Sequence, residues 1–267
     1  MTKLRPVILT CDSRLPIFRK FVESYLTIKD SMLSPIVIVG YKYPLVRDAY
    51  DSLIEQLDPH VVVEQTDHFK DVDVRKLIRK IRIGTHRHKA FINIQRIMIK
   101  DFPEIALNYS NPEENIIYIE DDVIFSSKFP EAVKGVSEHL EDKCDFITLY
   151  SPTLRGTNSY DTSRKITANG YTTKDGIPSY DLVHAIDGNH FYGTPCVSFN
   201  RKVLMQLREE WERADTLGRV WDHKWGKFMN LKGYRMYATR KSYVQHQSGY
   251  SNIERRERKL QSKIFIE

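Results

Sequence analysis

Hydrophobic residues along the chain follow two alternating patterns. Short runs rich in Val and Ile predict buried strands, whereas apolar residues three and four positions apart predict helices. The predicted strands are 5–11, 34–40, 61–64, 115–119, 144–150, 234–238 and 242–246. The predicted helices are 15–26, 43–57, 85–101, 129–140, 200–213 and 219–231. This repeated order predicts an α/β fold with a doubly wound, mostly parallel sheet flanked by helices, and right-handed crossovers.

Residues 151–190 interrupt this rhythm. They are rich in Gly, Ser, Thr, Asn, Asp and Tyr, a composition that predicts loops and short hairpins. Helical and strand patterns return after residue 200, and the chain contains no internal repeat. We therefore predict one domain whose second half is rich in loops.

Three consecutive carboxylates, Glu120, Asp121 and Asp122, follow the predicted strand 115–119. Ligands of α/β sheets bind at the carboxyl ends of strands. Mg²⁺ and Mn²⁺ prefer carboxylate and phosphate oxygens as ligands. Because adjacent acids repel one another, the triplet favours a wetted surface or a place beside a cation. It therefore predicts a divalent cation site that also holds a diphosphate; the alternative is an acidic turn.

The formal net charge of +6 is unevenly distributed. Between Arg75 and Lys100 there are nine Lys or Arg residues and no carboxylate. From Glu254 to Lys263 there are five basic residues and two acids. Such stretches suit anionic partners: the phosphates of a small ligand, nucleic acid or a membrane surface. The alternative is a solvated basic face.

Hydropathy and cysteine content suggest where the protein works. No apolar run approaches the ~20 residues that a spanning helix needs, and the N-terminus leads directly into a strand pattern without a signal-peptide core. The three cysteines, Cys11, Cys144 and Cys196, are far apart and odd in number. We therefore expect reduced thiols, no membrane span and a cytoplasmic protein.

Four segments, taken in order, resemble the GT-A glycosyltransferases and, within them, the N-acetylglucosaminyltransferase I-like group (glycosyltransferase family 13). They are the strand and turn 6–12, the stretch 86–95 leading into Tyr118–Val123, the loop Phe191–Gly193 and the motif Trp221–Trp225. The resemblance implies a GT-A type of α/β fold. It implies that residues 1–150 bind a nucleotide sugar and that residues 151–250 of the same domain bind the acceptor and carry catalysis. The charge of residues 251–267 predicts a basic tail.

The resemblance also assigns roles around the acidic triplet. Asp122 is implied as the ligand of Mn²⁺ or Mg²⁺, and His246 as a late ligand that completes the metal shell. The other residues implied in donor binding are Cys11, Asp12, Arg14, Arg87, Glu120 and Asp121. Arg87 lies near the start of a predicted helix, where N–H groups and cations suit a diphosphate. Asp12 alternatively fits a helix N-cap.

Asp222 is implied as the general base that takes the proton of the acceptor hydroxyl in an inverting displacement. Asp187 is a second candidate for this role. The chain departs from the family pattern in two places: the motif at 221–225 has a single Asp and an inserted residue, and Thr194–Cys196 replaces a more Gly-rich sequence. The donor sugar and the acceptor therefore do not follow from the resemblance.

We thus expect a metal-dependent, inverting glycosyltransferase that moves a hexosyl or N-acetylhexosaminyl group from a nucleotide sugar, by resemblance a UDP-sugar, to an acceptor hydroxyl. The basic stretches make a modified DNA base one acceptor class, and a bacterial surface glycan or lipid-linked acceptor is the alternative. A nucleic-acid-binding module on a degenerate transferase fold is a further alternative, against which the intact triplet argues. A nucleotidyltransferase is another, but it would need a Gly-rich loop that Thr10–Arg14 lacks.

Overall fold

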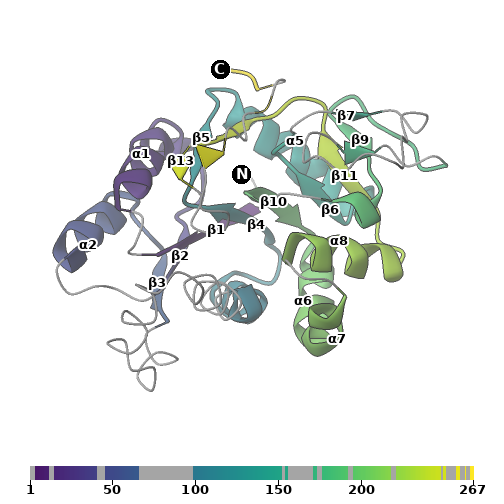
Figure 1. Ribbon diagram of the computed structural model, residues 1–267, viewed down its shortest axis with the longest axis horizontal. Helices are drawn as coiled ribbons and strands as arrows, with labels where there is room; N and C mark the ends of the chain where they lie inside the picture. Colours follow the sequence, from purple (N-terminus) through teal and green to yellow (C-terminus); the bar gives the residue numbers. More distant parts are fainter. Residues whose placement is uncertain are drawn as a thin grey trace.

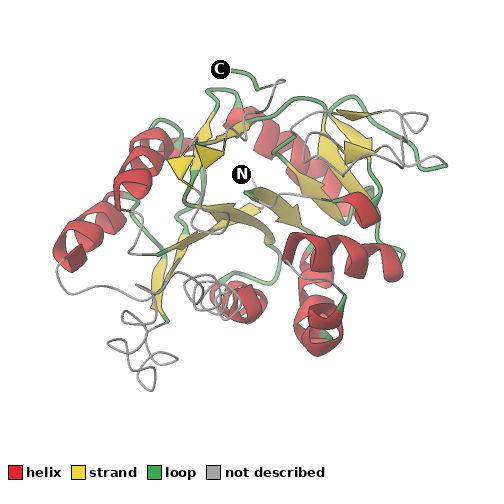
Figure 2. Ribbon diagram, in the orientation of Figure 1, coloured by secondary structure: helices red, strands yellow, loops and turns green. Residues whose placement is uncertain are grey.

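The fold is seen in a computed structural model of the chain (Figure 1). The structure describes residues 4–11, 15–40, 46–65, 99–151, 154–155, 171–172, 176–191, 195–217, 221–247, 249–250, 257–258, 262 and 265–267. Helices lie on both sides of a central sheet (Figure 2). Within the described residues, no helix combines the length and the apolar character needed to cross a bilayer.

The central sheet has eight strands in the order β3-β2-β1-β4-β10-β6-β11-β9. They are β1 (Leu4–Thr10), β2 (Ile36–Val39), β3 (Val61–Glu64), β4 (Asn115–Glu120), β6 (Phe146–Thr148), β9 (Val183–Ala185), β10 (Cys196–Phe199) and β11 (Met236–Thr239). β3, β2, β1 and β4 pair in parallel, as do β6 and β11. β10 and β9 are antiparallel to their neighbours. The predicted mostly parallel α/β sheet is confirmed.

Helices cover both faces of the sheet, and each face has one hydrophobic cluster beneath its helices. On one face lie α1 (Leu15–Leu26), α2 (Arg47–Gln56) and α5 (Phe129–Asp142). On the other lie the helical residues 99–109, α6 (Arg201–Glu209), α7 (Trp211–Thr216) and α8 (Trp221–Leu231). The helices therefore wrap the sheet on both sides, as a doubly wound fold requires.

Strand β4 shows how the two clusters divide one strand. Ile117 and Ile119 belong to the cluster under α1, whereas Ile116 and Tyr118 belong to the cluster under α8. Successive strand side chains point to opposite faces. Because both faces are covered, the strand reads as one continuous apolar run rather than an alternating one.

Three smaller ladders and two 3₁₀ turns complete the described structure. The ladders pair β5 (Val123–Phe125) with β12 (Val244–His246), β13 (Gly249–Tyr250) with β14 (Glu257–Arg258), and β7 (Leu154–Arg155) with β8 (Tyr171–Thr172). The turns are η2 (Lys29–Ser31) and η6 (Gly188–His190). The predicted strand 242–246 therefore pairs with β5 outside the main sheet, next to the acidic triplet.

Several elements differ from the sequence-based expectation. β10 was not predicted; it lies in the sheet between β4 and β6 and is antiparallel to both. The predicted helix 200–213 is divided into α6 and α7 at Glu210. The helix predicted to end at 101 continues to residue 109, and its predicted part 85–98 lies outside the described residues.

Candidate functional site

The acidic triplet lies at the carboxyl ends of two adjacent strands. β1 and β4 are in parallel register, with Leu9 opposite Glu120. The backbone N–H of Glu120 donates to Pro195 O at 2.8 Å, which ties this end of β4 to the residue before β10. The triplet thus stands on the rigid centre of the sheet, where ligands of α/β folds bind.

Two of the three acids are buried, which differs from the wetted strand end expected from the sequence. Asp121 is 2% exposed and Asp122 is 5% exposed, whereas Glu120 is partly exposed. The cover comes from β12, which pairs with β5 directly after the triplet. Gln247 closes this ladder, because its backbone N–H donates to Asp122 O at 2.7 Å and its side chain donates to Ile17 O at 3.2 Å.

Asp122 and His246, the two predicted metal ligands, lie together. Asp122 Oδ2 is 3.2 Å from His246 Nε2. His246 Nδ1 is 2.9 Å from Gln247 O, a contact that turns the ring so that Nε2 faces the carboxylate. Burial alone would lower the pKa of His246. The charge of Asp122, its hydrogen bond to the ring and the charge of Glu120 outweigh burial, so this pKa is raised overall.

Asp121 is held by a chain of hydroxyl groups. Thr10 Oγ1, at the end of β1, donates to Asp121 Oδ2 at 2.8 Å. Thr10 Oγ1 is also 2.7 Å from Tyr50 Oη, and Tyr50 Oη donates to Cys11 O at 2.6 Å. This network joins α2, the end of β1 and the triplet.

The partner of Glu120 is Tyr118, which belongs to the hydrophobic cluster under α8. Tyr118 Oη donates to Glu120 Oε1 at 3.2 Å, and the Tyr118 ring meets Trp225 of α8 edge to face at 5.3 Å. Burial, followed by the charges of the triplet, raises the pKa of Tyr118 far above its usual value. Burial and the charge of Asp122 also raise the pKa of Tyr150 to about 12. The negative charge of the triplet therefore acts on Tyr118 of β4 and on Tyr150, which follows β6.

The distance between Asp122 Oδ2 and His246 Nε2 is that of a direct contact, and it is also close to the spacing of two ligands of one divalent cation. Two ligands at right angles, each about 2.1 Å from one cation, lie about 3.0 Å apart; the observed separation of the two ligand atoms is 3.2 Å. No group of three or more His, Cys, Asp or Glu side chains that could hold a metal occurs among the described residues. Two protein ligands suit a Mg²⁺-type ion whose remaining positions are filled by substrate phosphates and water.

The two candidate bases lie on elements that touch each other. Asp222 is in the first turn of α8, where its Oδ1 accepts from His223 N at 2.9 Å. Asp187 caps η6 by accepting from Asn189 N at 3.0 Å. A Cβ on Gly226 of α8 would overlap the carbonyl oxygen of Gly188 in η6, so the two backbones are in direct contact. Both aspartates thus belong to one packed unit beside β4.

Several predicted site residues cannot be placed. Asp12, Arg14 and Arg87 lie outside the described residues, as does most of the acid-free stretch 75–100. Cys11 is described; it is partly exposed, and its carbonyl oxygen accepts from Tyr50. The roles of these residues in donor binding stay predictions.

Thr10, Tyr50 and Gln247 were not identified from the sequence. All three act through hydrogen bonds to residues far away in the chain, for example across 40 positions for Thr10 and Tyr50. One sequence signal could have indicated Thr10: it is the last residue but one of the predicted strand 5–11, whose end was expected to contact the nucleotide. No comparable local signal marks Tyr50, which sits among apolar helix residues as a core tyrosine would.

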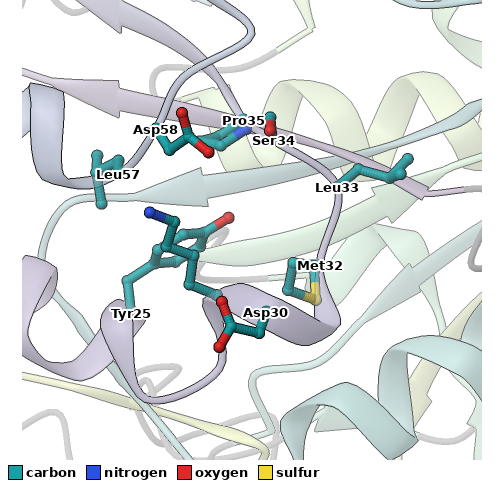
Figure 3. A pocket seen from close by; sticks show the side chains of 9 residues that line it. Tyr25, Asp30, Met32, Leu33, Ser34, Pro35, Leu57 and Asp58 are labelled. Carbon is teal, nitrogen blue, oxygen red and sulfur yellow. The ribbon is translucent and has the colours of Figure 1, made fainter.

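A separate cavity of about 160 Å³ lies at the other end of the sheet (Figure 3). It is lined by residues of α1 and η2 and by the turns before β2 and β3, which are Tyr25, Lys29, Asp30, Met32, Leu33, Ser34, Pro35, Leu57 and Asp58. The residues before parallel strands lie opposite the carboxyl ends. This cavity is smaller than the ~300–1,000 Å³ of usual ligand pockets, and it contains no predicted site residue.

Neither a protein-family model nor a curated protein matches the chain. Among solved structures, S. aureus TarS 1-349 is similar with a TM-score of 0.46 and 11% identity, over 91% of this chain and 60% of that chain. The galactosyltransferase LgtC, in complex with donor and acceptor sugar analogs, has a TM-score of 0.43 and 11% identity, over 88% and 73% of the two chains. The mannosyltransferase PcManGT from Pyrobaculum calidifontis, in complex with GDP-Man and Mn²⁺, has a TM-score of 0.43 and 12% identity, over 88% and 53%.

These likenesses do not place the chain in a family, because the TM-scores lie below 0.5 and the identities near one in ten. The chain also spans only 60% of the length of TarS 1-349. The expected membership of glycosyltransferase family 13 stays a prediction.

Proposed function

We propose that this chain is a glycosyltransferase that takes its sugar from a nucleotide sugar with the help of a divalent cation. The observation that carries the proposal is the meeting of Asp122 and His246 at the carboxyl end of β4, with ligand atoms 3.2 Å apart. These residues come from distant parts of the chain, and the ladder of β5 and β12 brings them together. Such a pair suits a cation that also binds a diphosphate.

Asp122 and His246 would hold the cation, which when bound supplies a Lewis acid that neutralises charge on the leaving nucleoside diphosphate. Thr10 and Gln247 keep the two ends of the acidic turn in place through Asp121 and the Asp122 carbonyl. The end of β1, at Cys11, would face the nucleotide. UDP is the nucleotide that the family resemblance implies.

Asp222 would act as the general base. In an inverting displacement, the acceptor oxygen bonds to the anomeric carbon while the bond from that carbon to the phosphate oxygen breaks. The hydroxyl proton passes to the carboxylate of Asp222. The location of Asp222 on α8 supports this role, since Trp225 of the same helix contacts Tyr118, which in turn binds Glu120 of the triplet. Asp187, on the contacting η6 turn, is the alternative base.

The class of acceptor is proposed from the basic residues of the chain. Nine basic residues and no acid between Arg75 and Lys100 exceed what one diphosphate needs. This excess supports a polyanionic acceptor, and a hydroxyl-bearing modified base in DNA is the class we propose. A bacterial surface glycan or a lipid-linked sugar is the competing class.

The test is release of nucleoside diphosphate from a panel of UDP-, GDP-, CDP- and ADP-sugars without an acceptor, after removal of metal and then with added Mn²⁺. We expect slow hydrolysis of one nucleotide class that depends on Mn²⁺. Asp122→Asn should lose this activity, whereas Glu138→Gln, an exposed acid on α5, should retain it. Release of pyrophosphate from a nucleoside triphosphate and a sugar phosphate would instead identify a nucleotidyltransferase. Hydrolysis that is equal with and without metal would contradict the cation site.

A further inference from the structure

We propose that Tyr50 is a positioning residue for the donor site, acting through Thr10 on the acidic triplet. This inference rests on the proposed function and extends it to a helix that carries none of the predicted site residues. Tyr50 is on α2 and is fully buried, and its ring stacks on Phe18 of α1 at 4.7 Å. Its hydroxyl group nevertheless reaches the carboxyl end of β1.

The hydroxyl of Tyr50 binds two groups that belong to different parts of the site. It donates to the carbonyl of Cys11 at 2.6 Å, so it fixes the backbone where β1 ends. Thr10 Oγ1 lies 2.7 Å from the same phenol oxygen and donates its own proton to Asp121 at 2.8 Å, so the one proton of Tyr50 is shared between Cys11 O and Thr10 Oγ1. One phenol therefore connects the end of β1, predicted to face the nucleotide, with the triplet, predicted to face the cation.

Position matters here because cation and diphosphate must be bound together. Productive sites hold their groups within about 0.5 Å, through neighbours whose own conformations are locked. Asp121 precedes Asp122 directly, so a shift of its carboxylate moves the backbone that carries the metal ligand. A buried polar network stiffens the groups that it joins, so we expect removal of the Tyr50 hydroxyl to loosen Thr10 and Asp121.

Packing alone does not require this hydroxyl group. Phenylalanine at position 50 would fill the same space and keep the stack on Phe18. Tyr25 provides the comparison: it is equally buried and belongs to the same hydrophobic cluster. Its hydroxyl has no hydrogen-bond partner among the described residues and lines the cavity at the opposite end of the sheet. Tyr25→Phe is thus a matched control that removes a buried phenol oxygen without touching the network.

The first measurement needs no substrate. Hydrogen exchange of peptides covering residues 115–125 should become faster in Tyr50→Phe and Thr10→Val, while Thr10→Ser and Tyr25→Phe should match the wild type. Thr10→Ser keeps the hydroxyl and therefore serves as the conservative rescue. Unchanged exchange in Tyr50→Phe would show that the hydroxyl does not hold the triplet, and would overturn the inference.

The second measurement is binding of Mn²⁺ and of UDP by calorimetry, with kcat and KM for donor hydrolysis. We expect Tyr50→Phe to weaken Mn²⁺ and UDP binding roughly tenfold, the effect of losing one buried hydrogen bond. KM for the donor should rise more than kcat falls. A Tyr50→Phe protein with a lower melting temperature but wild-type affinities and KM would assign the hydroxyl a purely structural role and overturn the inference.

The route through Thr10 is tested by combining the two substitutions. If Tyr50 acts through Thr10, the Tyr50→Phe/Thr10→Val protein should lose little more affinity than whichever single variant binds less tightly. Additive losses would contradict this route. A wild-type protein that binds neither Mn²⁺ nor any of UDP, GDP, CDP and ADP would overturn the proposed function, and the inference with it; wild-type binding that survives unchanged in Tyr50→Phe would overturn the inference alone.

Discussion

The two ends of the β1–β4 pair differ in their charged groups: one end has a buried ion pair, and the other has a cluster of carboxylates. At the amino-terminal end, Arg5 and Glu114 form a buried ion pair with contacts of 2.9 and 2.6 Å, and Arg5 also donates to Ser34 O. At the carboxyl end, three carboxylates follow β4. The partners that the structure describes for them are the hydroxyls of Thr10 and Tyr118 and the imidazole of His246.

We infer from this difference that the Arg5–Glu114 pair serves the fold, whereas the proposed function assigns the triplet to binding. Arg5 and Glu114 balance each other and are 8% and 6% exposed. The triplet places three carboxylates at one strand end with His246 against Asp122, an arrangement that suits a cation brought by a substrate. Substitutions at the carboxyl end should therefore cost activity more than stability, and those at the amino-terminal end the reverse.

The largest expected effect comes from Asp122→Asn. The amide keeps the size of the side chain but lacks the charge that would bind a cation, so the Lewis-acid contribution of several kcal/mol is lost. We expect kcat to fall on the order of 10³-fold or more, since 1.36 kcal/mol corresponds to a factor of ten. The measurement is donor turnover at saturating Mn²⁺, with circular dichroism to confirm the fold. Wild-type turnover would show that Asp122 is not a metal ligand.

Asp222→Asn should have the next largest effect. An amide cannot take the acceptor proton, so transfer should fall by about 10²–10⁴-fold, the usual contribution of a general base. Binding of Mn²⁺ and UDP should not change, which separates the base from the acidic triplet. Single-turnover transfer and calorimetry measure the two properties. If Asp187→Asn collapses the rate while Asp222→Asn retains it, the base belongs to the η6 turn.

Glu114→Gln tests the amino-terminal end. It leaves the buried guanidinium of Arg5 without its counter-charge, and breaking a buried pair in this way costs about 3–5 kcal/mol of unfolding free energy. The kcat of the folded variant should equal that of the wild type. Urea unfolding measures the change, and Glu113→Gln, an exposed neighbouring acid, is the control. A loss of kcat without a loss of stability would break the proposed division between the two ends.

The same variant has a pH signature. Burial would raise the pKa of Glu114, but hydrogen bonds from Arg5 and Asn111 and the charge of Arg5 lower it overall from 4.5. A folded-state pKa below the unfolded one stabilises the protein above the unfolded pKa, and this stabilisation is lost as the pH falls through the folded pKa. The stability gap between wild type and Glu114→Gln should therefore narrow below about pH 4.5. A gap that stays constant down to pH 3 would contradict this assignment.

The smallest expected effect on catalysis comes from the basic stretch. Charge reversal of Arg79, Lys80 and Arg82 should leave donor hydrolysis unchanged but weaken binding of duplex DNA at low salt. The slope of log affinity against log salt should decrease by about one unit for each lost phosphate contact.

A control separates local charge from net charge. Reversal of Lys20, Lys134 and Arg208, which are exposed on α1, α5 and α6, changes the net charge equally. It should leave the salt slope close to that of the wild type. Absence of DNA binding by the wild type at ~50 mM salt would remove the DNA acceptor and leave a glycan or lipid-linked sugar.

The sequence predicted elements whose signal is local and repeated. β1, β2 and β4 were recognisable because both of their faces are buried, which makes them continuous apolar runs. α1 was recognisable from its apolar stripe. β5 and β10 were missed although they are no shorter than β6 and β2, which were predicted; their pairing with distant strands defines them.

The site was likewise predictable only where its signal is local in the sequence. The triplet Glu120–Asp122 is contiguous and follows a strand, so the sequence alone indicated a place for binding. The meeting of His246 with Asp122 followed only from the family resemblance, because no local rule places a late histidine beside an earlier acid. The burial of Asp121 and Asp122 and the hydroxyl network through Tyr50 depend on how α2 and β12 pack, which no pattern in the sequence encodes.

The contact between Gly188 and Gly226 has a consequence for substitution at both positions. Because no side chain separates the two backbones, a Cβ on Gly188 would lie 2.4 Å from the carbonyl oxygen of Gly226, and a Cβ on Gly226 would lie 2.3 Å from that of Gly188. Even alanine would therefore push α8 and η6 apart, and we expect it to displace Asp187 relative to Asp222.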